Sequence, residues 1–296
     1  MGNPRWQGWR GFSYGPNGPC AQRLEQESEG RQMLPELKDE DIAIMLAALA
    51  GGTGRVQRVS LSDRDVWIKR YNRLGLRVGQ RCLWVFSRLL RQPVLRPAPL
   101  LDAKGLIDRE VRQIERFSAA GFLAPTVFYS GRTAIVLSHL GQPVERRMKE
   151  VAKADPAIHD KLLVRCGLEL GRLHAAGLCH GRPHPRDFII EDSRIGFLDF
   201  EEEPAAVMPL ATAQARDIWL FFLQVASRCL KPETPAATLA AWRSNRPAEA
   251  EAALTEIIPF FARLLPLARF ATRLRAGKDV MRFISATDFL QSATRR

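Results

Sequence analysis

Residues 168–204 read LELGRLHAAGLCHGRPHPRDFIIEDSRIGFLDFEEEP, and the rest of the fold can be worked out from this stretch. Leucines at helical spacing lead to His174 and to Gly177, which predicts an amphipathic helix that stops at the glycine. A polar turn with two prolines follows over residues 180–186. Two short apolar segments, residues 188–190 and 195–198, then predict a pair of β-strands joined by a charged turn.

The two predicted strands have a carboxylate at each open end. Asp187 precedes the first strand, and Asp199 follows the second. A tight turn between antiparallel strands brings these two ends together, so we expect both carboxylates at one rim. Mg²⁺ takes oxygen ligands and keeps substrate phosphates in the rest of its shell. The sequence therefore predicts a magnesium site at Asp187 and Asp199.

The order of these residues resembles the catalytic segment of the protein-kinase-like superfamily, H-R-D-x-x-x-x-N followed by D-F-G. His180 takes the place of the His, Asp187 that of the Asn, and Asp199 with Phe200 that of the Asp-Phe. In detail the segment is similar to H-G-D-x-H-P-x-N in lipopolysaccharide core (heptose and Kdo) kinases and related small atypical kinases. The resemblance implies an α+β, two-lobed kinase-like fold, with a small β-rich lobe carrying one main helix and a larger, mostly helical lobe. It also implies ATP and Mg²⁺ as cofactors.

Three positions depart from that pattern: Arg182 stands where the general-base Asp belongs, Asp187 replaces Asn, and Glu201 replaces Gly. Arginine stays protonated in proteins, so Arg182 cannot accept a proton from a substrate hydroxyl, although it can hold a γ-phosphate. His184 is a conceivable substitute base. In another register Asp187 is the base and Asp192 the metal ligand, but only seven residues then remain before Asp199, too few for both strands and their turn.

The resemblance implies further nucleotide contacts upstream. The strand lysine that contacts phosphates is Lys69, and its partner is Glu110, which we expect to head a helix that ends near Gly121. A glycine cluster before the strand, Gly51, Gly52 and Gly54, can bring backbone N–H groups to phosphate oxygens. Taken alone, such a cluster is more typical of a hairpin turn. Glu110 can equally be an ordinary solvated helix charge.

The chain divides by composition into three regions. Residues 1–34 are rich in Gly, Pro, Arg, Gln and Glu, which predicts a disordered or loosely attached arm. Residues 35–140 form the expected small lobe, with strands at 124–129 and 133–137, and residues 141–296 the helical lobe. His139 falls at the expected hinge. Asp217 resembles the aspartate that braces the kinase catalytic loop, or is a plain charge near a helix start. Helices are predicted over residues 247–265 and 267–283.

The net charge of +12 over 296 residues indicates an anionic partner. An insertion at about residues 73–100 predicts a helix with a basic face opposite an apolar one, which suits an anionic membrane surface or packing on the small lobe. The members of that face are Arg73, Arg77, Arg81, Arg88 and Arg91, with Trp84 among them. A second basic region follows near the C-terminus, where a solvated face is the simpler interpretation. Its members are Arg263, Arg269, Arg273, Arg275 and Lys278.

Three functions remain open from the sequence. The first is an ATP- and Mg²⁺-dependent kinase that phosphorylates a sugar or lipid-linked hydroxyl at the cytoplasmic face of a membrane. The second is a pseudokinase that binds a nucleotide or a partner as a scaffold, since Arg182 and Glu201 break the motif. The third, an atypical kinase linked to tRNA modification, fits less well because the apolar face of the insertion suits lipid better than nucleic acid. Five scattered cysteines and the lack of a signal peptide or spanning segment indicate a cytoplasmic location, peripheral to the membrane at most.

Overall fold

A computed structural model describes residues 37–71, 92–96, 98–99, 101–273 and 277–295. The chain separates into two units, residues 1–42 and residues 43–296, and the features below belong to the second. Helix α2 (Asp39–Gly51) crosses the boundary between the units. The predicted arm at residues 1–34 and the basic face of residues 73–91 lie outside the described residues.

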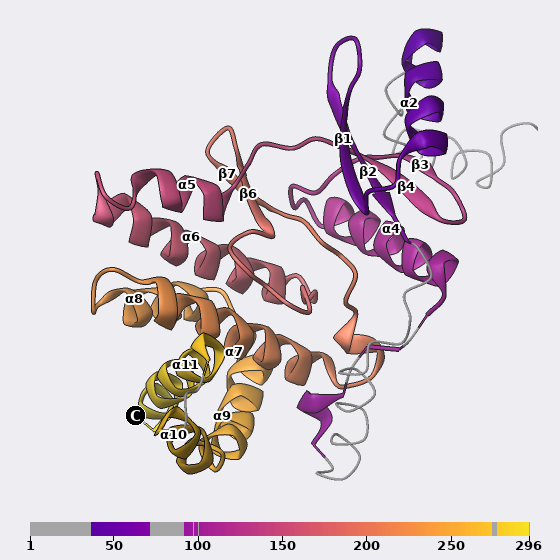
Figure 1. Cartoon of the computed structure of the whole chain (residues 1–296). Helices are drawn as coiled ribbons and strands as arrows, with labels where there is room; N and C mark the ends of the chain where they lie inside the picture. Colours follow the sequence, from indigo (N-terminus) through magenta and orange to yellow (C-terminus); the bar gives the residue numbers. More distant parts are fainter. Residues whose placement is uncertain (1–36, 72–91, 97, 100, 274–276, 296) are drawn as a thin grey trace, which may run out of the picture. The chain divides into compact units, whose positions relative to one another are not determined.

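A four-stranded antiparallel sheet carries the lysine singled out by the sequence (Figure 1). Its strands are β1 (Val56–Ser60), β2 (Asp65–Arg70), β3 (Val127–Ser130) and β4 (Ala134–Ser138), in the order β1-β2-β4-β3. Lys69 in β2 is paired with Val56 in β1 and with Ile135 in β4. Because side chains alternate along a strand, Trp67 and Lys69 share one face while Val66 and Ile68 are fully buried on the other.

Helix α4 (Ala103–Ala119) carries the second predicted residue. Asp102 caps its start by accepting a hydrogen bond from the backbone N–H of Gly105 at 2.8 Å. The helix ends before Gly121, whose φ of +82° favours glycine, as the sequence predicts. Glu110 does not head the helix, as we expected, but lies near its middle, because the capping aspartate places the start seven residues earlier.

A second, three-stranded sheet holds the two predicted acidic positions. It consists of β5 (Gln142–Pro143), β6 (Phe188–Glu191) and β7 (Arg194–Phe197), in that order. The strands β6 and β7 confirm the predicted pair. The two-residue β5 was not predicted, since it contains a proline and has no alternating pattern. Gly141 lets β5 approach β6, because a Cβ there would lie 1.9 Å from the carbonyl oxygen of Ile190.

The rest of the second unit is helical. Helices α5 (Val144–Val151), α6 (Pro156–Ala175), α7 (Leu210–Arg228) and α8 (Thr234–Arg243) precede α9 (Ala248–Ala262), α10 (Leu265–Arg273) and α11 (Lys278–Thr294). Short 3₁₀ turns lie at Pro93–Leu95 and Pro204–Ala206. Glycines at 167 and 171 let α6 meet the backbone of α8 closely. The single helix predicted over residues 267–283 is wrong: α10 and α11 are separate, and Gly277 is the N-cap of α11.

One apolar core extends beneath both sheets and the helices. Phe117 of α4 packs edge-on against Phe197 and Phe200, with ring centroids 5.4 and 4.8 Å apart. Trp242 of α8 and Phe222 of α7 are fully buried. Among the described residues, none of the helices is both long and apolar enough to cross a bilayer. The structure is therefore an α+β fold that is mostly helical.

Candidate functional site

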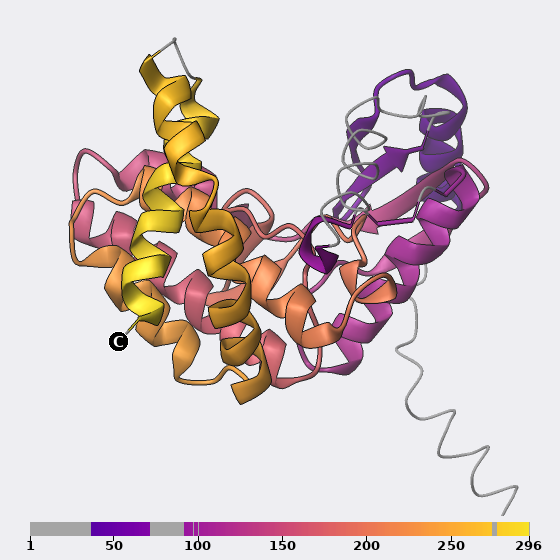
Figure 2. The same ribbon diagram turned by 90° about the horizontal axis from the view of Figure 1, so that it is seen from below.

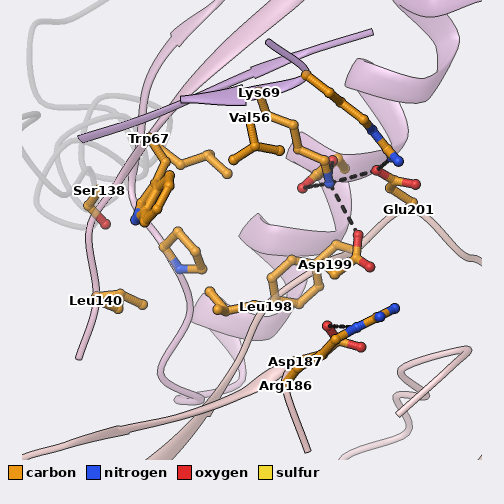
Figure 3. A pocket seen from close by; sticks show the side chains of 15 residues that line it. Val56, Trp67, Lys69, Ser138, Leu140, Arg186, Asp187, Leu198, Asp199 and Glu201 are labelled. Atoms are coloured by element: carbon orange, nitrogen blue, oxygen red, sulfur yellow. Dashed lines mark hydrogen bonds and ion pairs between the residues drawn. The ribbon is translucent and has the colours of Figure 1, made fainter. Parts of the chain in front are cut away.

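Lys69 lies among three carboxylates that come from two distant segments. Its Nζ donates to Glu110 Oε1 and Oε2 at 3.0 and 2.9 Å and to Asp199 Oδ1 at 3.2 Å. It also forms an ion pair with Glu201 Oε1 at 2.8 Å (Figure 3). Burial disfavours the charged lysine, but the three carboxylates outweigh this effect and raise the pKa of Lys69. Lys69 therefore stays cationic.

Glu110 is the most enclosed of these carboxylates, with 1% of the residue exposed. Its burial raises the pKa of Glu110 to about 7, against the opposing effect of the Lys69 ammonium. Asp199 and Glu201 are also partly buried, but the Lys69 ammonium prevails there and holds the pKa of each carboxyl below its usual range. Asp199 and Glu201 are therefore ionised at neutral pH, and Glu110 is the carboxyl that titrates near it.

Asp199 has a strained backbone. Its φ of +64° lies in the left-handed region, which a residue with a Cβ rarely adopts. The next residue, Phe200, is 2% exposed and packs in the aromatic cluster with Phe117. The packing of Phe200 fixes the chain on one side of Asp199, and β7 fixes it on the other. The carboxylate is thereby held toward Lys69.

A buried aspartate organises the turn before β6. Asp217 of α7 accepts the backbone N–H of His180 at 2.6 Å and that of Gly181 at 2.8 Å. His180 in turn contacts the carbonyl oxygen of Leu198 through Nε2 at 2.9 Å, which ties the turn to the segment of Asp199. The predicted brace by Asp217 is confirmed, although this residue lies well inside α7 and not at its start.

Asp187 lies in the cavity as a largely buried carboxyl. Burial raises the pKa of Asp187 to about 6, although His180 opposes the shift. Arg186 contacts its Oδ1 at 3.3 Å, while its Oδ2 has no hydrogen-bond partner among the described residues. A buried, unpaired carboxylate oxygen is costly without a cation or a donor. The donor chemistry at Asp187 and Asp199 therefore fits a hard divalent cation such as Mg²⁺.

The protein alone offers few ligands for such an ion. No group of three or more His, Cys, Asp or Glu side chains with metal-binding geometry exists in the described part of the chain. Both oxygens of Asp199 contact cationic side chains, Oδ1 that of Lys69 and Oδ2 that of Arg182. A Mg²⁺ ion bound to Asp199 would replace one of these contacts and would take phosphate oxygens and water as its other ligands.

Arg182 and His184 occupy different surroundings. Arg182 points to the site, with Nη2 3.3 Å from Asp199 Oδ2, and its side chain is 45% exposed. His184 does not line the cavity: its Nδ1 accepts the backbone N–H of Arg186 at 3.1 Å, and its Nε2 lies 3.2 Å from Arg228. Burial and the nearby Arg228 lower the pKa of His184 to about 4. This geometry gives no support for His184 as a substitute base. Asp192, the ligand in the other register, lies in the β6–β7 turn with φ of +44°.

The glycine segment has a packing role of its own. Gly51 ends α2, and a Cβ on Gly52 would lie 2.1 Å from the guanidinium of Arg70. Arg70 donates to the carbonyl oxygens of Ala48 and Gly54 at 2.6 and 2.9 Å. The three glycines are not among the residues that line the cavity, whereas the following residue, Arg55, is.

The cavity of about 360 Å³ has one charged and one apolar end. Figure 3 shows Trp67, Ser138 and Leu140 at the end away from Lys69. Trp67 is anchored there by donating its Nε1–H to His139 Nδ1 at 2.9 Å. The apolar lining consists of Val56, Trp67, Pro125, Leu137, Leu140, Leu198 and Phe200. An elongated ligand with an apolar part at one end and a charged part at the other fits this division.

Sequence reasoning missed three members of the site. Glu201 was treated only as a departure from glycine, yet it is the closest carboxylate to Lys69 and also pairs with Arg55. Trp67 carried a signal, because it is two residues from Lys69 on the same strand and so shares its face. The sequence had no signal for Arg55, since its position depends on the pairing of β1 with β2.

Comparisons with known proteins add little. No protein-family model and no curated protein matches the chain. A structure of Rv3197 with erythromycin from Mycobacterium tuberculosis is similar at a TM-score of 0.31 and 15% identity, over 92% of this chain and 79% of that chain. This likeness is too weak to show a shared fold or function.

Proposed function

We propose that this protein is an ATP- and Mg²⁺-dependent phosphotransferase of the protein-kinase-like class. The observation that carries the proposal is the contact of Lys69 with both Glu110 and Asp199, in a cavity that Asp187 also lines and where the Oδ2 atom of Asp187 has no hydrogen-bond partner among the described residues. These are the groups that the sequence resemblance assigns to phosphate and metal binding. The sheet with α4 and the helical region correspond, in this proposal, to the small and large lobes of a kinase.

The division of the cavity supports a nucleotide as its ligand. The base would lie at the apolar end beside Trp67, and the phosphates would reach Lys69 and Arg55 at the charged end. Asp187 and Asp199 would hold Mg²⁺, which neutralises charge on the phosphate oxygens when bound. Glu201 must then leave Lys69 for a phosphate to take its place, since the ammonium has only three donors.

Phosphoryl transfer depends mainly on positioning and charge neutralisation. Arg182 near Asp199 can contact a γ-phosphate oxygen and stabilise charge there. General-base help is worth about 10² to 10⁴ in rate, so its loss slows transfer without abolishing it. We propose a sugar or lipid-linked hydroxyl as acceptor, of the kind used by the lipopolysaccharide kinases that the sequence resembles.

A second candidate is a pseudokinase that binds a nucleotide without turnover. The pairing of Arg182 with Asp199 favours it, because Arg182 cannot act as a base and His184 is turned to Arg228. In that case the nucleotide would order the site for a partner.

Turnover separates the two candidates. We would measure Mg²⁺-dependent release of ADP from ATP, with water alone and with added sugar hydroxyls as acceptors, by the wild type and by Arg182→Asp, which restores the carboxylate of the motif. A phosphotransferase has activity in the wild type that is lost in Lys69→Ala and rises in Arg182→Asp. Nucleotide binding without release in the wild type supports the pseudokinase. Absence of both binding and release contradicts both candidates.

A further inference from the structure

Helix α10 presents its apolar side chains to solvent. Leu267 is 68% exposed and Phe270 is 56% exposed, the two highest fractions among the large hydrophobic side chains of the described residues. Leu265, by contrast, is buried and anchors the start of the helix. Residues three apart on a helix lie on one face, so Leu267 and Phe270 form a single outward-facing pair.

Positive charge surrounds this pair. Arg273 is exposed and lies three residues after Phe270, so it shares the face of the apolar pair, and Arg263 is exposed in the turn that precedes the helix. The sequence has no Asp or Glu between Glu256 and Asp279. The exposed face of α10 therefore has an apolar centre, with one arginine after it on the helix and another in the turn before the helix. We define the α10 face as these four residues: Leu267, Phe270 and Arg273 of the helix, and Arg263 of the preceding turn.

Helix α10 packs against helix α11. Arg269, which is not part of the α10 face, forms hydrogen bonds of 2.8 Å with both carboxylate oxygens of Asp288 in α11. Helix α11 in turn packs against α7 and α9, which Figure 2 shows from below. Arg269 thus links α10 to α11 through an ion pair at the surface, and Arg263 and Arg273 are exposed as well.

We propose that the α10 face docks on the surface of an anionic lipid bilayer. Leucine and phenylalanine flanked by arginines are what an interfacial helix uses: the apolar side chains enter the boundary of the acyl chains, and the cations contact the headgroups. The overall charge of +12 adds long-range attraction to the same surface. Nucleic acid fits less well, because the centre of the face carries aliphatic as well as aromatic groups and no hydrogen-bond donor.

This assignment differs from the sequence interpretation, in which the C-terminal arginines are a solvated face and residues 73–100 either contact a membrane or pack on the small lobe. It does not rest on the proposed phosphotransfer. A bilayer contact would place the protein where lipid-linked acceptors occur, but the α10 face lies outside the nucleotide cavity. Its variants should therefore leave nucleotide binding unchanged.

The first test is co-sedimentation of the full chain with vesicles of phosphatidylcholine, with and without phosphatidylglycerol. We expect binding only to the anionic vesicles. The double variant Leu267→Ser, Phe270→Ser should lower the partition coefficient at least about tenfold, and Arg263→Gln or Arg273→Gln about fivefold each. Ile158→Ser and Leu230→Ser, at positions with 43% and 50% exposure elsewhere, are matched controls that should bind as the wild type does.

The second test locates the contact. A Phe270→Trp variant should gain a fluorescence component that lipids brominated on their acyl chains quench, and Ile158→Trp should not. Equal binding of the double serine variant and the wild type would overturn the proposal, as would a lack of quenching in the Phe270→Trp variant. A dimer that the double serine variant abolishes would instead assign the α10 face to a second copy of the chain. Unchanged melting temperatures show that the variants are folded.

Discussion

The ammonium of Lys69 lies 3.2 Å from the carboxylate of Asp199, although 130 positions separate the two residues in the chain. The lysine lies in the four-stranded sheet. The aspartate lies in the segment that follows the last strand of the separate three-stranded sheet. The strained backbone of Asp199 shows that the surrounding packing holds this contact in place. The groups around this pair determine how the site should respond to substitution.

Glu201 competes with a ligand for Lys69. Its Oε1 lies 2.8 Å from the ammonium and also pairs with Arg55. Glu201→Gln removes the negative charge from the phosphate end of the cavity. We expect it to tighten Mg²⁺-nucleotide binding by about fivefold, corresponding to about 1 kcal/mol, as measured by calorimetry.

Glu202→Gln is the control for this change, because Glu202 pairs with Arg216 and does not line the cavity. Its affinity should equal that of the wild type. Weaker binding by Glu201→Gln would mean that Glu201 helps to hold the metal ion.

Asp187 should lower the stability of the metal-free protein at neutral pH. Burial raises its native pKa to about 6, so well below pH 4 the carboxyl is protonated in both the native and the unfolded state and costs nothing. As pH rises through 4 to 6, the unfolded state loses this proton first and the native state loses stability. Asp187→Asn has no such titration and should be more stable by about 1 to 3 kcal/mol at pH 7.

Urea unfolding in the presence of a chelator, at about pH 3 and pH 7, measures this difference. The advantage of Asp187→Asn should be present at pH 7 and absent at about pH 3. An equal difference at both pH values would show that the carboxyl of Asp187 has an ordinary pKa.

Asp217 should be important for stability because it satisfies two buried backbone donors. Its carboxylate accepts the N–H groups of His180 and Gly181 and is itself fully buried. Asp217→Ala leaves these donors unpaired, and we expect a loss of about 3 to 5 kcal/mol in the free energy of unfolding. Asp279→Ala, at a side chain that is 92% exposed, should change it by less than about 0.5 kcal/mol. A loss below about 1 kcal/mol for Asp217→Ala would contradict the brace.

The two neighbouring glycines should respond differently to alanine. A Cβ at position 52 would meet the Arg70 guanidinium at 2.1 Å, whereas one at position 51 meets nothing within 4 Å. Arg70 is 7% exposed and cannot move without losing its bonds to Ala48, Gly54 and Gln57. We expect Gly52→Ala to destabilise by about 2 to 3 kcal/mol, and Gly51→Ala to be neutral or stabilising by up to about 1 kcal/mol. Thermal unfolding of both variants tests this contrast, and equal effects would contradict it.

The elements that contain their own signals were predictable. The helix over α6, the strands β6 and β7, and the end of α4 at Gly121 follow from apolar periodicity and from glycine in the left-handed region. The contact of Lys69 with Glu110 and Asp199 depends on tertiary packing. It could therefore be predicted only from the resemblance to kinases. Periodicity alone could not give the start of α4, which the capping Asp102 determines.

Other features have no local signal in the sequence. The strand β5 forms because Gly141 permits close approach to β6. A strand of two residues is too short for a sequence pattern to predict it. The break between α10 and α11 falls in a stretch whose apolar spacing continues through it. Glu201 belongs to the site because its side chain points back to Lys69. A comparison with the kinase motif shows Glu201 only as a mismatch to glycine.

Lys69 and Asp199 should together form a nucleotide and metal site, and a thermal-shift titration with ATP measures this property. Ligand at 100 times its dissociation constant stabilises the native state by about 2.7 kcal/mol. We predict that ATP raises the melting temperature of the wild type only when Mg²⁺ is present, and that Lys69→Ala and Asp199→Asn abolish the shift. The nucleotide site is refuted if ATP with Mg²⁺ leaves the wild type unchanged, or shifts the wild type and both variants equally.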